Sequence, residues 1–184
     1  MTIPSDVVTA GEASLDVLKQ VLAGVGPDDL ARQTPCTDFD VAALTDHLMN
    51  SITVIGGAAG AVLPERDASA PIVDQVTAAA RPALAAWRSR GLDGTVSVGP
   101  GEMPAARIAG ILPLEFLVHA WDYATAVGRQ VDAPDDLAGY VLGMTRSALT
   151  PETRSAVGFD GPVAVPADAS PMDQLVAFTG RRAT

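Results

Sequence analysis

The chain has 184 residues, 48% of them hydrophobic, and this length and composition suit one domain with a sizeable core. Its 22 acidic and 12 basic residues give a net charge of −10, which repels a phosphate backbone and argues against nucleic-acid binding. The longest stretch without a charged residue, 48–64, contains polar side chains and glycines and falls short of the roughly 20 apolar residues that a membrane-spanning helix needs.

The N-terminal residues have neither the basic segment nor the apolar segment of a secretory signal, so we expect a cytoplasmic protein. A single cysteine, Cys36, cannot form an internal disulfide, which agrees with a reducing compartment. Beside a proline at the start of a helix, Cys36 is more typical of a small buried side chain than of a reactive thiol. The sequence leaves the oligomeric state open, a homodimer included.

Helical spacing of apolar residues recurs along most of the chain. Asp40 is placed to cap the second helix, and Pro82 and Pro113 predict a kink and a bend inside later ones. The connection 92–103 has room for one brief strand. The predicted helices span 6–23, 41–63, 72–90, 104–127, 135–149 and 171–179.

Four of these helices are long and their connections are too irregular for a sheet, so we expect an all-α protein, a four-helix bundle in one domain. Its core helices occupy roughly 5–150, and 151–184 form a short C-terminal extension. Within the second helix, the run of small residues from Gly56 to Gly60 lacks the lysine of a phosphate-binding loop, and close helix packing explains it better.

The helix predicted over 104–127 is apolar nearly all round and must be deeply buried, yet it carries Glu115, His119 and Asp122. Spacings of four and three residues place these side chains on one helix face. A desolvated carboxylate without a partner costs several kcal/mol, on the order of the penalty for a buried ion. In the second helix, His47 falls within the inward apolar stripe.

Two imidazoles and a carboxylate form a three-ligand set suited to a divalent metal, with a fourth position left for water or substrate. Glu115 and His119 can reach one ion across a helical turn, and His47 completes the set if the two helices are neighbours. The alternative is a buried Glu–His pair and an unrelated core histidine bonded to a carbonyl.

Several segments resemble one known family. They are Thr34-Pro35-Cys36 before an aspartate-capped helix, Leu44-Thr45-Asp46-His47-Leu48 within it, Glu115-Phe116-Leu117-Val118-His119-Ala120-Trp121-Asp122, and a tail from Val163 to Ala169 that leads to Phe178-Thr179-Gly180-Arg181. Together they are similar to the DinB-like metal-binding superfamily, in the actinobacterial branch that includes the N-terminal domain of mycothiol-dependent maleylpyruvate isomerase.

The resemblance implies a four-helix bundle with one divalent metal, most often zinc, although Ni²⁺ or another divalent ion fits too. It implies that His47, Glu115 and His119 are the ligands. Characterised relatives activate mycothiol or bacillithiol for S-transfer or isomerisation, because a metal-bound thiol is deprotonated. The isomerase itself uses an arginine from a second domain that this chain is too short to contain, so maleylpyruvate is not the expected substrate.

Two functions are compatible with these residues and with the resemblance. The first is a metal-dependent enzyme of transferase or isomerase type that activates a mycothiol-type thiol or, as a hydrolase, water, for attack on a small electrophile. The second is a non-catalytic, metal-stabilised bundle or small-molecule binding protein. Three ligands favour the first, whereas Asp122 as a fourth ligand would favour the second.

The remaining candidates have simpler roles. Asp122 is expected to accept a hydrogen bond from a ligand imidazole in preference to lying on the surface. Arg181 and Arg182 either approach an anionic substrate from the tail or are solubilising charges, which is the commoner case. Asp46 points about 100° away from His47 around the helix and belongs on the surface. The aromatic residues Trp87, Trp121 and Tyr123 are expected in the core, the last two flanking the ligand turn.

Overall fold

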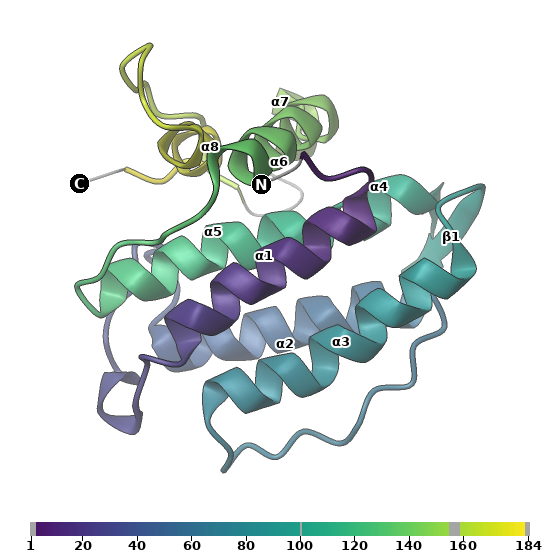
Figure 1. Ribbon diagram of the computed structural model, residues 1–184, viewed down its shortest axis with the longest axis horizontal. Helices are drawn as coiled ribbons and strands as arrows, with labels where there is room; N and C mark the ends of the chain where they lie inside the picture. Colours follow the sequence, from purple (N-terminus) through teal and green to yellow (C-terminus); the bar gives the residue numbers. More distant parts are fainter. Residues whose placement is uncertain (1–2, 100, 155–158, 183–184) are drawn as a thin grey trace.

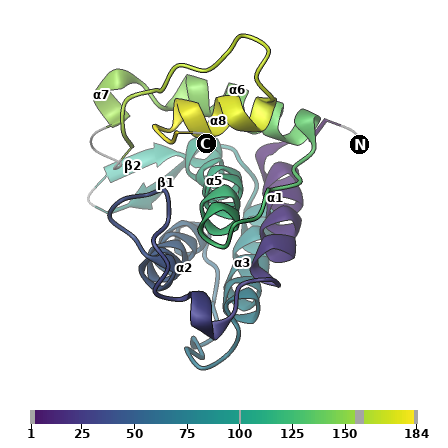
Figure 2. The same cartoon turned by 90° about the vertical axis from the view of Figure 1, so that its left-hand side faces the viewer.

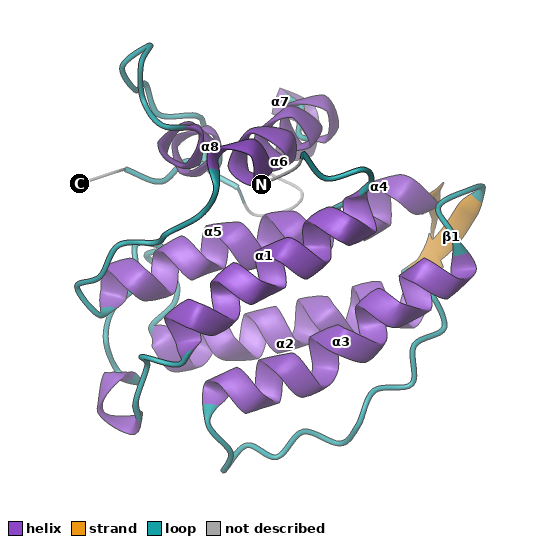
Figure 3. Cartoon of the chain, in the orientation of Figure 1, coloured by secondary structure: helices purple, strands orange, loops and turns teal. Residues whose placement is uncertain are grey.

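The computed structural model describes residues 3–99, 101–154 and 159–182. It is mostly helical with one small sheet (Figure 3). The elements are, in chain order, α1 (Val7–Leu22), the short 3-10 helix η1 (Pro27–Asp29), α2 (Val41–Ala58), α3 (Ile72–Arg90), β1 (Thr95–Val98), β2 (Gly101–Pro104), α4 (Ala105–Ala109), α5 (Ile111–Ala126), α6 (Asp135–Ala148), α7 (Pro151–Arg154) and α8 (Pro171–Phe178).

The four long helices α1, α2, α3 and α5 each pack against two of the others. In Figure 1, α1 and α5 lie above α2 and α3, and Figure 2 shows α2 and α5 nearly end on. Helices α6 and α8 pack together beside α5 and α1. The expectation of a mainly α-helical protein is confirmed.

Side-chain caps define the starts of α1 and α2. The Asp6 carboxylate accepts a hydrogen bond from Thr9 N at 2.8 Å at the start of α1, and the Asp40 carboxylate accepts from Ala43 N at 2.8 Å at the start of α2. Capping of this kind satisfies one of the free N–H groups of a first turn. The predicted cap at Asp40 is therefore confirmed.

The second predicted helix is too long, because α2 ends at Ala58 rather than near Leu63. Gly60 follows with φ of +82°, a left-handed conformation that glycine adopts without steric cost and that ends the helix. Before that end, a Cβ atom on Gly56 would lie 2.8 Å from the Cβ of Ala83 on α3. Close packing of helices at Gly56 is thus confirmed.

The helix predicted over 104–127 is wrong as a single element. It divides at Gly110 into α4 and α5. Pro113 lies in the first turn of α5 and has no N–H to donate to the preceding turn, which explains a break at this point. The expected bend is therefore a separation into two helices.

The connection 92–103 also differs from the expectation of one brief strand. Strands β1 and β2 pair antiparallel, with Val96 opposite Met103. The Val96 side chain is buried, and the hairpin packs against α2 and α4. A short helix, α7, lies between the helices predicted over 135–149 and 171–179.

The core is continuous across the long helices and includes Trp87 and Tyr123, both fully buried. The Trp87 indole N–H donates to the carbonyl of Ile55 at 3.1 Å, and the Tyr123 and Thr45 hydroxyls hydrogen-bond at 2.9 Å. These bonds tie α3 and α5 to α2. Among the described residues, no helix is both long enough and apolar enough to cross a membrane.

Candidate metal centre

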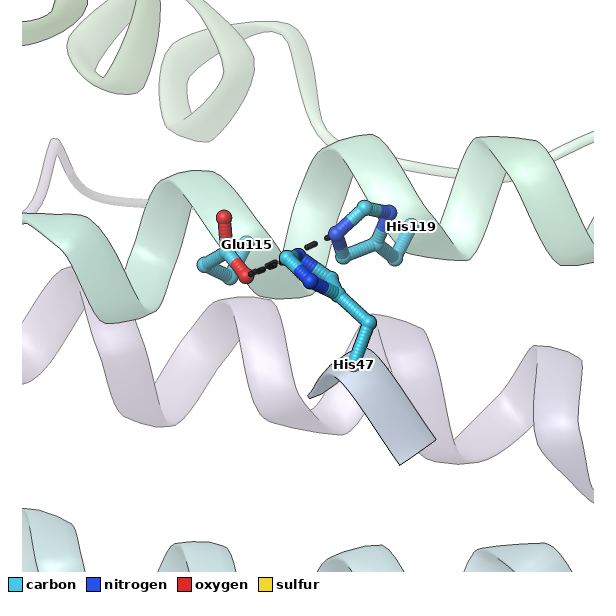
Figure 4. A group of neighbouring side chains, drawn as sticks. All are labelled: His47, Glu115 and His119. Carbon is cyan, nitrogen blue, oxygen red and sulfur yellow. Dashed lines mark ion pairs between the residues drawn. The ribbon is translucent and has the colours of Figure 1, made fainter. Parts of the chain in front are cut away.

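Helices α2 and α5 bring the three predicted ligands together. Glu115 and His119 lie one turn apart on α5, and His47 reaches them from the neighbouring helix α2 (Figure 4). His47 Nε2 lies 3.3 Å from Glu115 Oε2, and His119 Nε2 lies 3.5 Å from the same oxygen. One ligand atom from each residue can be chosen so that all three lie within 4.8 Å of one another.

The two imidazoles approach this point from different directions. Their ring centroids are 5.3 Å apart and the ring planes stand at 87° to each other. The Glu115 and His119 side chains are 8% and 5% exposed, whereas that of His47 is 38% exposed. Solvent therefore reaches the cluster at His47.

Two polar atoms of the cluster are buried without a hydrogen-bond partner in the part of the chain that the structure describes. They are Glu115 Oε2 and His119 Nε2, which face each other. Buried polar atoms almost always have a partner, so two such atoms at one point call for an explanation. A cation accepted by both, together with His47, provides one. The residues present therefore fit a divalent ion.

The charges at the site are strongly coupled. Burial by itself raises the pKa of Glu115, but the imidazoles of His119 and His47 outweigh burial and hold that pKa below its usual range. Burial by itself lowers the pKa of His119, but Asp122 and Glu115 on either side of the ring raise it to about 9. In the absence of a metal, the buried carboxylates hold a proton on His119.

Asp122 lies on the far side of the His119 ring from Glu115. Its Oδ2 atom is 2.9 Å from His119 Nδ1, as expected from the sequence. Arg181 holds the same carboxylate through two atoms, with Nε 3.0 Å from Oδ1 and a terminal nitrogen 2.8 Å from Oδ2. Burial raises the pKa of Asp122, but His119 and Arg181 outweigh it and lower that pKa overall.

The expectation for Arg181 is wrong. Its side chain is only 9% exposed, so it is no solubilising charge, and its guanidinium is committed to Asp122 rather than open to a substrate. Arg182, by contrast, is exposed. Sequence reasoning missed the pairing because Asp122 and Arg181 are 59 residues apart and no local pattern connects them.

The loop before α2 forms the other border of the site. The Phe39 ring stacks on His47 with centroids 5.1 Å apart. Gln33 donates to the Phe39 carbonyl at 2.9 Å, and the Thr34 hydroxyl donates to it at 2.6 Å. Cys36, in the same loop, is half-buried, and burial raises the pKa of its thiol. The thiol therefore stays protonated at neutral pH, as expected of a packing side chain.

Except for Trp121, the remaining candidates lie where the sequence placed them. Asp46 points away from the cluster, is 70% exposed and pairs with Arg66 at 2.7 Å. Trp87 and Tyr123 are in the core, whereas Trp121, which was also expected there, is only half-buried and packs against the core.

The fold and the site define a helical protein with a His, Glu, His cluster between two of its helices. A model of the family described as the mycothiol maleylpyruvate isomerase N-terminal domain matches residues 12–124. The chain belongs to this family, and the resemblance seen in the sequence is confirmed. All three residues of the cluster lie within the matched segment.

Two relatives match nearly the whole chain. Uncharacterized protein Rv0738 of Mycobacterium tuberculosis (strain ATCC 25618 / H37Rv) and uncharacterized protein MT0763 of strain CDC 1551 / Oshkosh are each 29% identical to it over 179 residues. The alignment covers 96% of this chain and 98% of each relative. No solved structure matches the chain.

Proposed function

We propose that the protein binds one divalent metal, preferably zinc, through His47, Glu115 and His119. We further propose that the metal activates a small thiol of the mycothiol type. The activated thiol would be transferred to a small electrophile or would catalyse its isomerisation. The observation that carries the proposal is a pair of buried atoms, Glu115 Oε2 and His119 Nε2, that lie 3.5 Å apart beside His47 and form no hydrogen bond among the described residues. Two nitrogens and one oxygen are a donor set that Zn²⁺ accepts.

The number of protein ligands supports an enzyme rather than a structural metal. Structural zinc sites usually have four protein ligands, whereas catalytic sites have three and an exchangeable position. Among the described residues, the group that can hold an ion consists of His47, Glu115 and His119. Asp122 is engaged with His119 and Arg181, so it is not available as a fourth ligand.

A bound divalent ion would supply the charge that deprotonates a thiol or a water molecule near neutral pH. The protein's own residues prepare for this. Asp122 accepts the Nδ1–H of His119 and so leaves Nε2 free to bind an ion. Glu115 contributes a negative charge, and the partly exposed His47 marks the side that a small molecule can reach.

The family supports a thiol as the partner, since its description names mycothiol. We propose that the thiol approaches past His47 and Phe39, where solvent reaches the cluster. Activation of water for hydrolysis remains the alternative chemistry for the same ligands.

We also propose a fold type, a domain organisation and a cellular location for the protein. The packing of α1, α2, α3 and α5 supports a four-helix bundle of the DinB-like kind. The contact of Arg181 with Asp122 supports one domain that includes the C-terminal extension 151–184. A cytoplasmic location agrees with the single cysteine, which can form no internal disulfide.

Elemental analysis of the purified protein tests the metal proposal. We expect about one zinc per chain and loss of stoichiometric zinc in His47→Ala, Glu115→Ala and His119→Ala. Asp46→Ala is the matched control, because this carboxylate neighbours His47 in sequence but lies on the surface. Undiminished metal in the three variants would show that the ligand set is wrong.

Calorimetric titration with mycothiol tests the chemistry separately. The zinc-loaded protein should bind mycothiol, while the metal-free protein and an S-methylated mycothiol should give no binding. If the loaded protein fails to bind mycothiol and simple thiols alike, the thiol proposal fails, and either activation of water or a non-catalytic metal site replaces it.

A further inference from the structure

We propose that Arg181 is a positioning residue of the metal centre, which holds the Asp122 carboxylate in place and thereby fixes the His119 ring with Nε2 directed at Glu115. The inference rests on three side chains connected by hydrogen bonds: Arg181, Asp122 and His119. Arg181 binds both oxygens of Asp122, at 3.0 and 2.8 Å, and Asp122 Oδ2 lies 2.9 Å from His119 Nδ1. Each of the three side chains is less than one-tenth exposed.

The backbone conformation of the C-terminal segment places Arg181 at this position. After α8 ends, Gly180 adopts φ of +91°, and a Cβ atom there would collide with Asp160. This turn brings the backbone N–H of Arg181 within 3.0 Å of the Val176 carbonyl. One guanidinium nitrogen also donates to the Thr179 carbonyl at 3.3 Å. The arginine is therefore fixed at its backbone and at its tip.

A second buried arginine secures the same segment. Arg154 donates to the carbonyls of Phe178 at 2.7 Å and Asp160 at 3.0 Å, and its guanidinium lies 4.5 Å from the centroid of the Phe178 ring. Phe178 is the last residue of α8. Arg154 therefore holds the chain at Asp160 and again at Phe178, three residues before Arg181.

The guanidinium acts on His119 through the shared carboxylate. An imidazole that donates Nδ1–H presents its Nε2 lone pair on the opposite side of the ring, and partners of this kind orient metal-ligating histidines. Arg181 prevents Asp122 from rotating, because a bidentate pair fixes both carboxylate oxygens. Without the guanidinium, Asp122 would be a buried charge with one remaining partner, free to turn away from His119.

Arg181 lies outside residues 12–124, the segment that the family model matches. The C-terminal extension therefore takes part in the site. The inference rests on the proposed function in one respect, since it concerns the orientation of a proposed ligand.

The test is a titration of the metal-free protein with Co²⁺. The d–d absorption bands monitor binding, and competition with a chelator gives the affinity. Arg181→Met should weaken the binding of Co²⁺ by about 10–100-fold and change the band positions. Arg181→Lys, which keeps the charge, should recover part of the affinity. Arg182→Met is the control, because it also removes one positive charge, but from the exposed residue next to Arg181. Its Co²⁺ affinity and band positions should match those of the wild type.

Wild-type affinity and wild-type bands in a folded Arg181→Met protein would overturn the inference. If that variant does not fold, as judged by circular dichroism, Arg181→Gln replaces it under the same criterion. If the wild type binds no Co²⁺ or Zn²⁺, the proposed function fails, and proton NMR of the metal-free protein decides the inference. The exchange-protected Nδ1–H signal of His119 should be present in the wild type and Arg182→Met but lost in Arg181→Met, and its retention in Arg181→Met would refute the inference.

Discussion

Metal binding at the proposed centre should strengthen steeply with pH, because His119 must lose a proton before its Nε2 atom can bind an ion. In the metal-free protein, burial disfavours the charged ring, but the carboxylates of Asp122 and Glu115 raise the pKa of His119 to about 9. Both carboxylates have lowered pKa values and are already ionised at neutral pH. The proton on His119 therefore competes with the metal.

The size of the effect follows from the distance between the working pH and this pKa. At pH 7, His119 lies two pH units below its pKa of about 9, so removing the proton costs about 3 kcal/mol, or roughly a factor of 100 in affinity. The apparent affinity should rise about tenfold per pH unit from 7 to 9 and level off above 9. An unperturbed histidine, with a pKa of about 6.5, would give a flat profile over that range.

Competition between the metal-free protein and a chelator of known pH dependence measures this profile, and calorimetry at pH 7 in buffers of different ionisation enthalpy counts the released protons. Asp122→Asn removes one of the two charges that raise the pKa of His119, so its profile should level off at a lower pH. A wild-type affinity that stays constant between pH 7 and 9 would refute the reasoning.

Two further predictions concern stability. The raised pKa of His119 stabilises the metal-free fold, and this stabilisation is complete below pH 6.5, the approximate pKa of histidine in the unfolded chain. Urea titrations should therefore show that the free energy of unfolding falls by roughly 3 kcal/mol as pH rises through 9. A free energy of unfolding that does not change over this range would contradict the prediction. Gly56→Ala should cost about 1–3 kcal/mol, because the new Cβ would lie 2.8 Å from a side chain of α3. The matched Gly57→Ala has open space around it and should instead stabilise the protein by about 0.5–1 kcal/mol, which thermal unfolding measures; equal effects of the two changes would refute the packing argument.

Local chemistry made much of the fold predictable. Asp6 and Asp40 precede apolar helical patterns, and both act as caps at the starts of the expected helices. Glu115 and His119 are brought together by α5 itself, since residues four apart share a helix face. The approach of His47 depends on the packing of α2 against α5, and spacing within the sequence does not determine that packing.

The errors arose where tertiary contacts decide the conformation. The chain between α3 and α5 forms a hairpin because the helices bury Val96, whereas β1 and β2 have only four residues each and give a weak pattern. Arg181 looked like a surface charge because two arginines near a chain end usually are. Its burial depends on Asp122, a partner 59 residues away.

Because the proposed ligands come from two helices, metal binding should be coupled to folding. Glu115 and His119 share a face wherever α5 is helical, but His47 joins them only when α2 packs against α5. An ion held by all three therefore binds the folded chain and not the unfolded one, and mass action converts its binding free energy into stability. The residue that completes the site is also the one most open to solvent. In this arrangement α5 provides a preformed half of the proposed centre, and the contact between α2 and α5 provides the half that faces solvent.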